Sequence, residues 1–211
     1  MSQMEDILEL YTQPTDPAHP LVCMDELSKH LRGDVREPLP TAPGQPARID
    51  SEYERHGVSN LFLAFAPLLA WRDVSVTARR TQVDWAHYVQ GLVDVHFPDA
   101  EWITLVVDNL NTHTLASLYV AFEPAEARRI ARKLDLHYTP KHGSWLNMAE
   151  IEFSALSRQC LDRRLSDAET LKSEVAAWVT ARNAHGMTVD WRFTAEDARI
   201  KLKHLYPQIQ S

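Results

Sequence analysis

Long apolar segments are absent from this sequence, and its first ten residues are acidic where a secretory signal would be basic. We therefore expect no membrane span, no signal peptide and no membrane partner. Cysteine is scarce: Cys23 and Cys160 are the only two, and they lie far apart in the chain. Each lies in an apolar or amphipathic segment, which favours buried free thiols over a disulfide or a metal-binding pair. This pattern predicts a protein of a reducing compartment, the cytoplasm.

Positive charge is also in short supply, because the 211 residues carry a net charge of −7. Such a balance argues against a nucleic-acid partner. The deficit lies in the first half: residues 1–100 contain 8 Lys and Arg against 15 Asp and Glu, whereas residues 101–211 contain 14 of each. Taken singly, the basic clusters of the second half are best explained as solvated helix faces; they are Arg128-Arg129, Arg132-Lys133, Arg163-Arg164 and Lys201-Lys203.

The most informative stretch is 102–113, WITLVVDNLNTH. Its Trp, Ile, Thr and Val residues favour a buried strand over a helix segment. The apolar run stops at Asp108-Asn109, so the strand would deliver a carboxylate at its C-terminal end. Open α/β sheets bind their ligands at such ends. Considered alone, however, an Asp at this position is more often part of a turn.

Apolar periodicity and turn residues predict the other elements. A helix over 5–11 and a proline-containing linker precede a first strand, 21–24, which ends at Asp25-Glu26. Residues 32–58 contain four prolines and are predicted to be mostly loop. The later elements are a hairpin (60–66 and 71–77), a helix from Thr81 to Pro98, the strand described above, helices over 115–122 and 124–134, a strand over 136–139, and helices over 148–162, 166–183 and 194–205. This order indicates an α/β domain, a mixed sheet with helices on both faces.

Three carboxylates stand out as candidate metal ligands. Asp25 and Asp108 follow strands, and Glu150 lies early in the helix that begins near Met148. Magnesium prefers oxygen ligands and retains several waters, so three carboxylates could hold two ions. Two such ions about 4 Å apart can activate a water or a 3′-hydroxyl and stabilise the leaving oxygen in a displacement at phosphorus.

Other interpretations of these residues remain open on spacing alone. Asn147-x-x-Glu150 is also the spacing of a capping box, in which Glu150 folds back onto the helix start. Glu152 is another potential ligand, although two helical positions turn it about 200° away from Glu150. Glu26 should point to the face of its strand opposite Asp25. The histidines His113, His137 and His142 form no zinc-type pair and are better explained as surface or supporting residues.

The candidate ligands lie in three blocks of sequence: VCMDE at 22–26, VVDNLNTH at 106–113 and YTPKHGSWLNMAEIE at 138–152. These blocks resemble the catalytic blocks of mariner-superfamily DDE transposases, and more closely those of the bacterial insertion-sequence branch. The third is the most specific, because the family pattern Pro-x-x-x-x-x-Leu-Asn-x-x-Glu appears as Pro140, Leu146, Asn147 and Glu150. The segments DRR at 162–164 and 189–207 also resemble that branch, so the resemblance covers nearly all of the chain from residue 20.

The resemblance implies an RNase H-like fold, with a mixed five-stranded sheet flanked by helices and a catalytic, metal-binding triad of Asp25, Asp108 and Glu150. The implied activity is cutting of transposon ends and joining of their 3′-hydroxyls to target DNA with two Mg²⁺ or Mn²⁺ ions. The implied protein is a bacterial homodimer, associated with the nucleoid when it acts on DNA. Supporting roles would fall to Asn109, His113 and Asn147. We also expect DNA contacts from basic residues that flank the site in sequence, namely Lys141, Arg158, Arg163 and Arg164.

Two departures from the family pattern qualify these expectations. Relatives carry N-terminal helix-turn-helix domains, whereas here we expect a helical remnant and linker over 1–20 before a catalytic domain over 21–207. The alternative function is therefore a catalytically inactive, truncated transposase that acts as a dimerisation or regulatory partner. In addition, 41 residues separate Asp108 from Glu150, more than is common in the superfamily. The helix over 124–134 accounts for the extra length.

Overall fold

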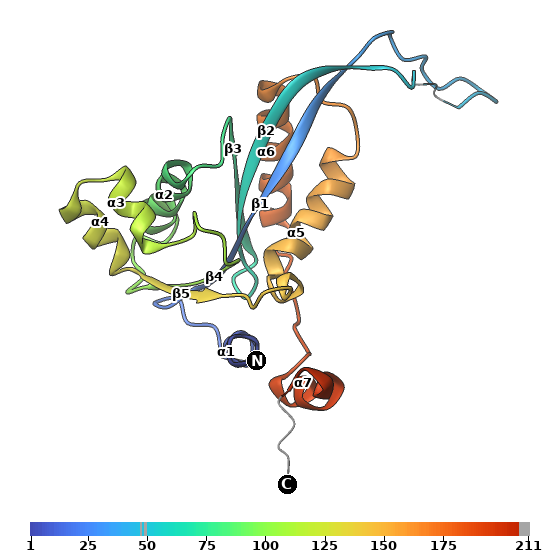
Figure 1. The fold of residues 1–211 in the computed structure, drawn as a ribbon. Helices are drawn as coiled ribbons and strands as arrows, with labels where there is room; N and C mark the ends of the chain where they lie inside the picture. The colour runs from blue at the N-terminus through green and yellow to red at the C-terminus, as the bar shows by residue number, and fades with distance from the viewer. Residues whose placement is uncertain (47, 49, 207–211) are drawn as a thin grey trace.

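The computed structural model describes residues 1–46, 48 and 50–206, and its centre is a five-stranded mixed sheet (Figure 1). The strand order is β3-β2-β1-β4-β5. Strands β1 (Leu21–Asp34), β2 (Tyr53–Ala66) and β3 (Trp71–Thr77) are antiparallel neighbours, whereas β4 (Ile103–Val107) and β5 (Leu134–Tyr138) run parallel to β1. The predicted α/β class and the five-stranded mixed sheet are confirmed.

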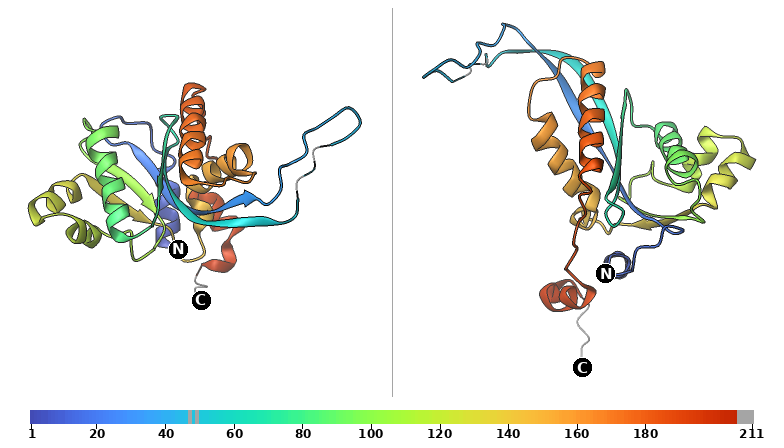
Figure 2. Two further views of the ribbon diagram at one scale, coloured as in Figure 1. Left: turned by 90° about the horizontal axis from the view of Figure 1, so that it is seen from above. Right: turned by 180° about the vertical axis from the view of Figure 1, so that it is seen from behind.

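Helices cover both faces of this sheet, as the two views of Figure 2 show. One face carries α2 (Gln82–Gly91), α3 (Leu115–Ala121) and α4 (Pro124–Ala131), and the other carries α5 (Met148–Leu156) and α6 (Ala168–Ala184). Each face has its own apolar core. Alternation along β1 divides its side chains between them, because Val22 and Met24 enter the core under α2 while Cys23 enters the core under α5. Cys23 and Cys160 are buried free thiols, as predicted.

The starts of α2 and of α7 (Ala195–Lys201) follow the predicted capping chemistry. Thr81 and Thr194 close capping boxes there with Asp84 and Asp197. The predicted Ser166 box is wrong, because Asp167 is the cap of α6 and accepts the Thr170 N–H. Two helices end in a π-helical turn and two short 3-10 turns occur; these segments are Leu92–His96 after α2, Ser157–Leu161 after α5, Ser144–Leu146 and Lys203–Leu205.

The first hairpin is much longer than its apolar pattern predicts, and the expectation of a loop over 32–58 is wrong for its two ends. Pairing between β1 and β2 continues to Asp34 opposite Tyr53, and a two-stranded ribbon projects beyond the helices (Figure 1). We call the paired segments 28–34 and 53–58 the arm. The arm is polar because its outer half has no helix layer to bury an apolar face, and it therefore lacks the apolar signal of a core strand.

Helix α1 (Ser2–Leu10), which we expected to be a remnant preceding the catalytic domain, packs into the core under α5. Its Ile7 and Leu8 are fully buried in that core. Tyr11, just beyond the helix, donates a hydrogen bond from its hydroxyl to the carbonyl of Leu146 at 2.5 Å. The first residues thus support the turn that precedes α5. The expected domain division after residue 20 stays a prediction. The other expected boundary, residue 207, lies outside the described residues. Within them, none of the helices combines the length and apolarity that a bilayer crossing requires.

Candidate active site

The candidate site lies where β1 and β4 separate. These parallel strands pair only from Leu21 opposite Thr104 to Cys23 opposite Val106. Asp25 comes two residues after the last of these pairs, and Asp108 comes immediately after the end of β4. The two aspartates therefore flank the point at which the central strands diverge, which is the edge where open α/β sheets bind ligands.

Asn147 fixes the start of α5 against this point. Its side-chain carbonyl accepts the Ala149 N–H at 3.1 Å, and its amide donates to the carbonyl of Met24, next to Asp25, at 2.8 Å. Glu150 lies in the first turn of the helix held in this way. The capping-box interpretation of Glu150 is wrong, because the Asn147 N–H donates to the Ser144 carbonyl. Among the described residues, the Glu150 carboxylate has neither a hydrogen bond nor an ion pair.

The charges of Asp108 and Glu150 act on Asp25. Burial, together with these two negative charges, raises the pKa of Asp25 to about 6, although the Glu26 N–H and the charge of His113 oppose the rise. That N–H donates to Asp25 Oδ1 at 2.7 Å. In the part of the chain that the structure describes, no three acidic, histidine or cysteine side chains are gathered closely enough to hold an ion. Carboxylates without a cation between them repel, and Asp108 is turned toward a histidine.

That histidine, His113, is fully buried and connects two acidic residues. Its Nδ1 lies 2.5 Å from Asp108 Oδ1, an ion pair whose angle departs from that of a hydrogen bond, and its Nε2 lies 2.9 Å from Glu26 Oε1. Burial lowers the pKa of His113, but the contacts with Asp108 and Glu26 outweigh it and raise the pKa to about 9. His113 is thus a cation beside Asp108. The sequence did not predict the pairing of His113 with Glu26, which lies on the face of β1 opposite Asp25.

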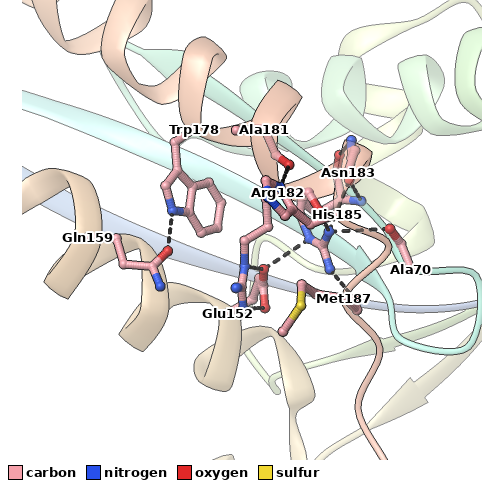
Figure 3. Close-up of polar contacts among 10 residues, drawn as sticks. Ala70, Glu152, Gln159, Trp178, Ala181, Arg182, Asn183, His185 and Met187 are labelled. Atoms are coloured by element: carbon pink, nitrogen blue, oxygen red, sulfur yellow. Dashed lines mark hydrogen bonds and ion pairs between the residues drawn. The ribbon is translucent and has the colours of Figure 1, made fainter.

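Glu152 is excluded as a ligand because its carboxylate is buried and already paired. Its side chain is 1% exposed and lies 2.9 Å from the Nε of Arg72 and 2.8 Å from that of Arg182. Figure 3 shows Glu152 facing Arg182 beneath the end of α6. The pair lies between the sheet and α6, so Glu152 stabilises the packing of α5 and α6 on the sheet.

The remaining candidates lie around the site or away from it. Asn109 is exposed and has no hydrogen bond among the described residues. His137 contacts Asp6 at 2.7 Å and Asp135 at 3.0 Å, and His142 is exposed with a positive φ of 65°. These two histidines therefore do not join Asp108.

The four predicted DNA contacts differ in their availability. Lys141 and Arg158 are exposed and unpaired within the described residues, whereas Arg163 forms an exposed ion pair with Glu174 at 2.5 Å. Arg164 is committed to the arm: its guanidinium contacts Asp34 at 2.5 Å and donates to backbone carbonyls at the far end of the ribbon. We therefore assign Arg164 a structural role and keep the other three as candidate DNA contacts.

A pH dependence of stability follows from Asp25. Its pKa is raised in the folded state from 3.8 to about 6, so its carboxylate destabilises the metal-free fold as pH rises through this window. The full effect above pH 6 is about 3 kcal/mol by the usual conversion. Asp25→Asn should therefore raise the thermal midpoint of metal-free protein at neutral pH and leave it almost unchanged near pH 4. An equal effect at both pH values, measured by circular dichroism, would contradict this assignment.

Comparison with known proteins indicates the family to which this chain belongs. A family model described as DDE superfamily endonuclease matches residues 20–172. A search of curated proteins found no match. Similar solved folds include the Mos1 strand transfer complex, at 15% identity and TM-score 0.59, and a Mos1 mariner paired-end complex with Mn, at 16% and 0.59. A third is the Mos1 transposase paired-end complex with left transposon end, at 16% and 0.57.

The Mos1 matches cover most of this chain but only part of the Mos1 chain. Each Mos1 comparison covers 88% of this chain but only 55% or 56% of the Mos1 chain, so this sequence spans little more than half of that protein. The predicted RNase H-like fold is confirmed by the same matches. Because the family model covers most of the sequence, including Asp25, Asp108 and Glu150, the chain belongs to the DDE superfamily of endonucleases.

Proposed function

We propose that this chain is the catalytic domain of a DNA transposase. It cuts phosphodiester bonds at transposon ends and joins the resulting 3′-hydroxyls to target DNA. The observation that carries the proposal is that the charges of Asp108 and Glu150 act on Asp25 beside the β1–β4 separation, in a chain of this endonuclease family. The fold similarity to Mos1 complexes with transposon ends supports the choice of substrate.

The chemistry of the donors fits divalent metal ions. The charges of Asp108 and Glu150 act on Asp25, and Glu150 has no partner that competes for it within the described residues. Oxygen-only donors suit Mg²⁺ and Mn²⁺. When bound, two such ions would activate the attacking oxygen and stabilise the leaving oxygen. Asp25, Asp108 and Glu150 would hold them, and the comparison with a Mos1 complex containing Mn is consistent with this choice.

The neighbouring residues orient this set. Asn147 ties the first turn of α5, which contains Glu150, to the backbone beside Asp25, and the charge of Glu150 acts on Asp25. His113 holds Asp108 in place from a fully buried position and is itself held by Glu26. Lys141, Arg158 and Arg163 supply positive charge that would contact DNA phosphates.

The test uses the chain on pre-nicked transposon-end DNA. With Mg²⁺ or Mn²⁺ we expect cleavage products and strand-transfer products on a gel, and with a chelator we expect neither. Failure with both metals, in protein that is folded by circular dichroism, would overturn the proposal. Co-purification of such an inactive chain with a full-length transposase would favour the regulatory-partner function instead.

A further inference from the structure

Two arginines face each other across the arm without an acid between them. Arg32 of β1 and Arg55 of β2 are directly opposed in the strand register. Like charges in this position destabilise an antiparallel pair. The guanidinium of Arg32 lies 4.5 Å over the ring of Tyr53, and Arg55 has no ion pair or hydrogen bond from its side chain within the described residues. The fold therefore maintains a local excess of positive charge at a cost in stability.

A bulge shapes the arm at the same place. The register shifts between His30 and Arg32, so that His56 and Gly57 lie opposite the single residue Leu31. Gly57 has a φ of 100°, a conformation that suits glycine and fits a bulge that bends the ribbon. The bend is accompanied by a cavity of about 410 Å³ lined by Arg32, Arg55 and their neighbours.

A second cavity continues this hollow toward the catalytic strand ends. It measures about 430 Å³, shares His30 and Arg32 with the first, and extends to Ser28 and Lys29. Ser28 and Arg32 follow Asp25 by three and seven residues on the same strand. At about 3.3 Å per residue, the lining lies roughly 10–23 Å from Asp25 along β1. We call the two cavities together the arm groove.

The acids near the arm groove do not neutralise it. Asp34 is paired with Arg164, and Glu54 contacts His56. Asp162 lines the second cavity and is exposed. Its single negative charge is outnumbered by the positive charges of Lys29, Arg32 and Arg55. The ammonium of Lys29 donates to the carbonyls of Leu161 and Arg163, at 2.6 and 3.2 Å.

We propose that the arm groove binds the phosphodiester backbone of DNA several nucleotides away from the reacting phosphate. Arg32 and Arg55 would contact phosphates, because their planar guanidinium groups match phosphate oxygens in pairs. Such contacts position a duplex without reading its sequence. The proposal rests on the proposed function, because it assigns a second contact to the same DNA.

The test measures how DNA affinity depends on salt. A fluorescein-labelled mixed-sequence duplex is titrated with the complete chain, without divalent metal, from about 50 to 200 mM salt. The Arg32→Gln/Arg55→Gln double variant should reduce the slope of log affinity against log salt by about 1.8, because each lost phosphate contact accounts for about 0.9. Its thermal midpoint should be equal to or above that of the wild type, since a like-charge pair is removed.

Arg79→Gln/Arg80→Gln is the matched control, because these adjacent arginines are exposed and have no ion pair within the described residues. It removes the same charge at the β3–α2 connection and should leave the slope close to that of the wild type. Equal slope losses in the two double variants would mean a general charge effect and would overturn the proposal. An unchanged slope in the arm variant, or binding of polyglutamate with the same arginine dependence, would also overturn it.

The cleavage assay keeps this result separate from the proposed function. If the wild type cleaves DNA with metal but the Arg32→Gln/Arg55→Gln variant has the wild-type salt slope, the transposase activity stands and DNA binding by the arm groove is contradicted. If the slope depends on these arginines but no cleavage occurs, the arm groove stands as a DNA-binding site and the proposed activity is contradicted.

Discussion

Replacing Asp108 with asparagine is expected to lower metal-dependent DNA cleavage by at least about a thousandfold, which corresponds to about 4 kcal/mol of lost transition-state stabilisation. Asparagine has nearly the shape of aspartate but no charge to hold a divalent ion, and bound ions contribute several kcal/mol in such reactions. The Asp108 side chain is 31% exposed and follows the end of β4, so the substitution leaves the apolar core intact. Initial rates on pre-nicked transposon-end DNA measure the effect.

Asp135→Asn is the control for this substitution. Asp135 is also an aspartate paired with a histidine, since its carboxylate lies 3.0 Å from Nε2 of His137. It is exposed on β5 and is not among the charges that act on Asp25. We expect this variant to cleave at the wild-type rate. If Asp108→Asn kept more than about a tenth of the activity, Asp108 would not be a metal ligand.

Replacing Glu152 with glutamine is expected to destabilise the fold by about 3–5 kcal/mol, the usual cost of breaking one partner out of a buried ion pair. Arg72 would then be a buried cation facing a neutral amide, with 1% of its surface exposed. Desolvation already lowers the pKa of Arg72, and the charge of Glu152 opposes that effect. At 2–4 °C per kcal/mol for a chain of this size, the thermal midpoint should fall by roughly 6–20 °C.

Glu150→Gln is a control on the same helix, because it makes the same chemical change two residues earlier. Glu150 has no ion pair among the described residues, and its negative charge repels that of Asp25. Its replacement should leave the midpoint of metal-free protein unchanged or higher, yet abolish cleavage. Thermal melts and cleavage rates of the two variants should therefore show opposite patterns. A similar loss of stability in both would contradict the separation of roles.

Local patterns in the sequence were enough to predict the sheet and most helices. The apolar run of β4 identifies a central strand because it is buried on both faces, and it locates Asp108 at the end of that strand. Asn147 identifies the start of α5, because its side chain caps the helix by accepting the Ala149 N–H. The assignment of the three carboxylates as metal ligands remains a prediction, which the Asp108 substitution tests.

Contacts between distant segments could not be predicted in the same way. Glu26 and His113 are 87 residues apart, and nothing local to either residue indicates the other. The same holds for Arg164, which looks like a surface cation in the sequence but is used to hold the arm. The arm itself was missed because a ribbon without a covering layer needs no apolar alternation.

The anchoring of the arm has a mechanical consequence. Several contacts join the arm to the segment after α5. The Lys29 ammonium donates to the carbonyls of Leu161 and Arg163, the Arg32 N–H donates to the Leu165 carbonyl at 2.8 Å, Arg164 pairs with Asp34, and His56 Nδ1 lies 2.8 Å from the Ser166 carbonyl. These contacts hold the segment that follows α5 to the arm, while Asn147 holds the start of α5 to β1. We therefore expect that a force bending the arm would act on α5 through this segment and reach the turn that carries Glu150.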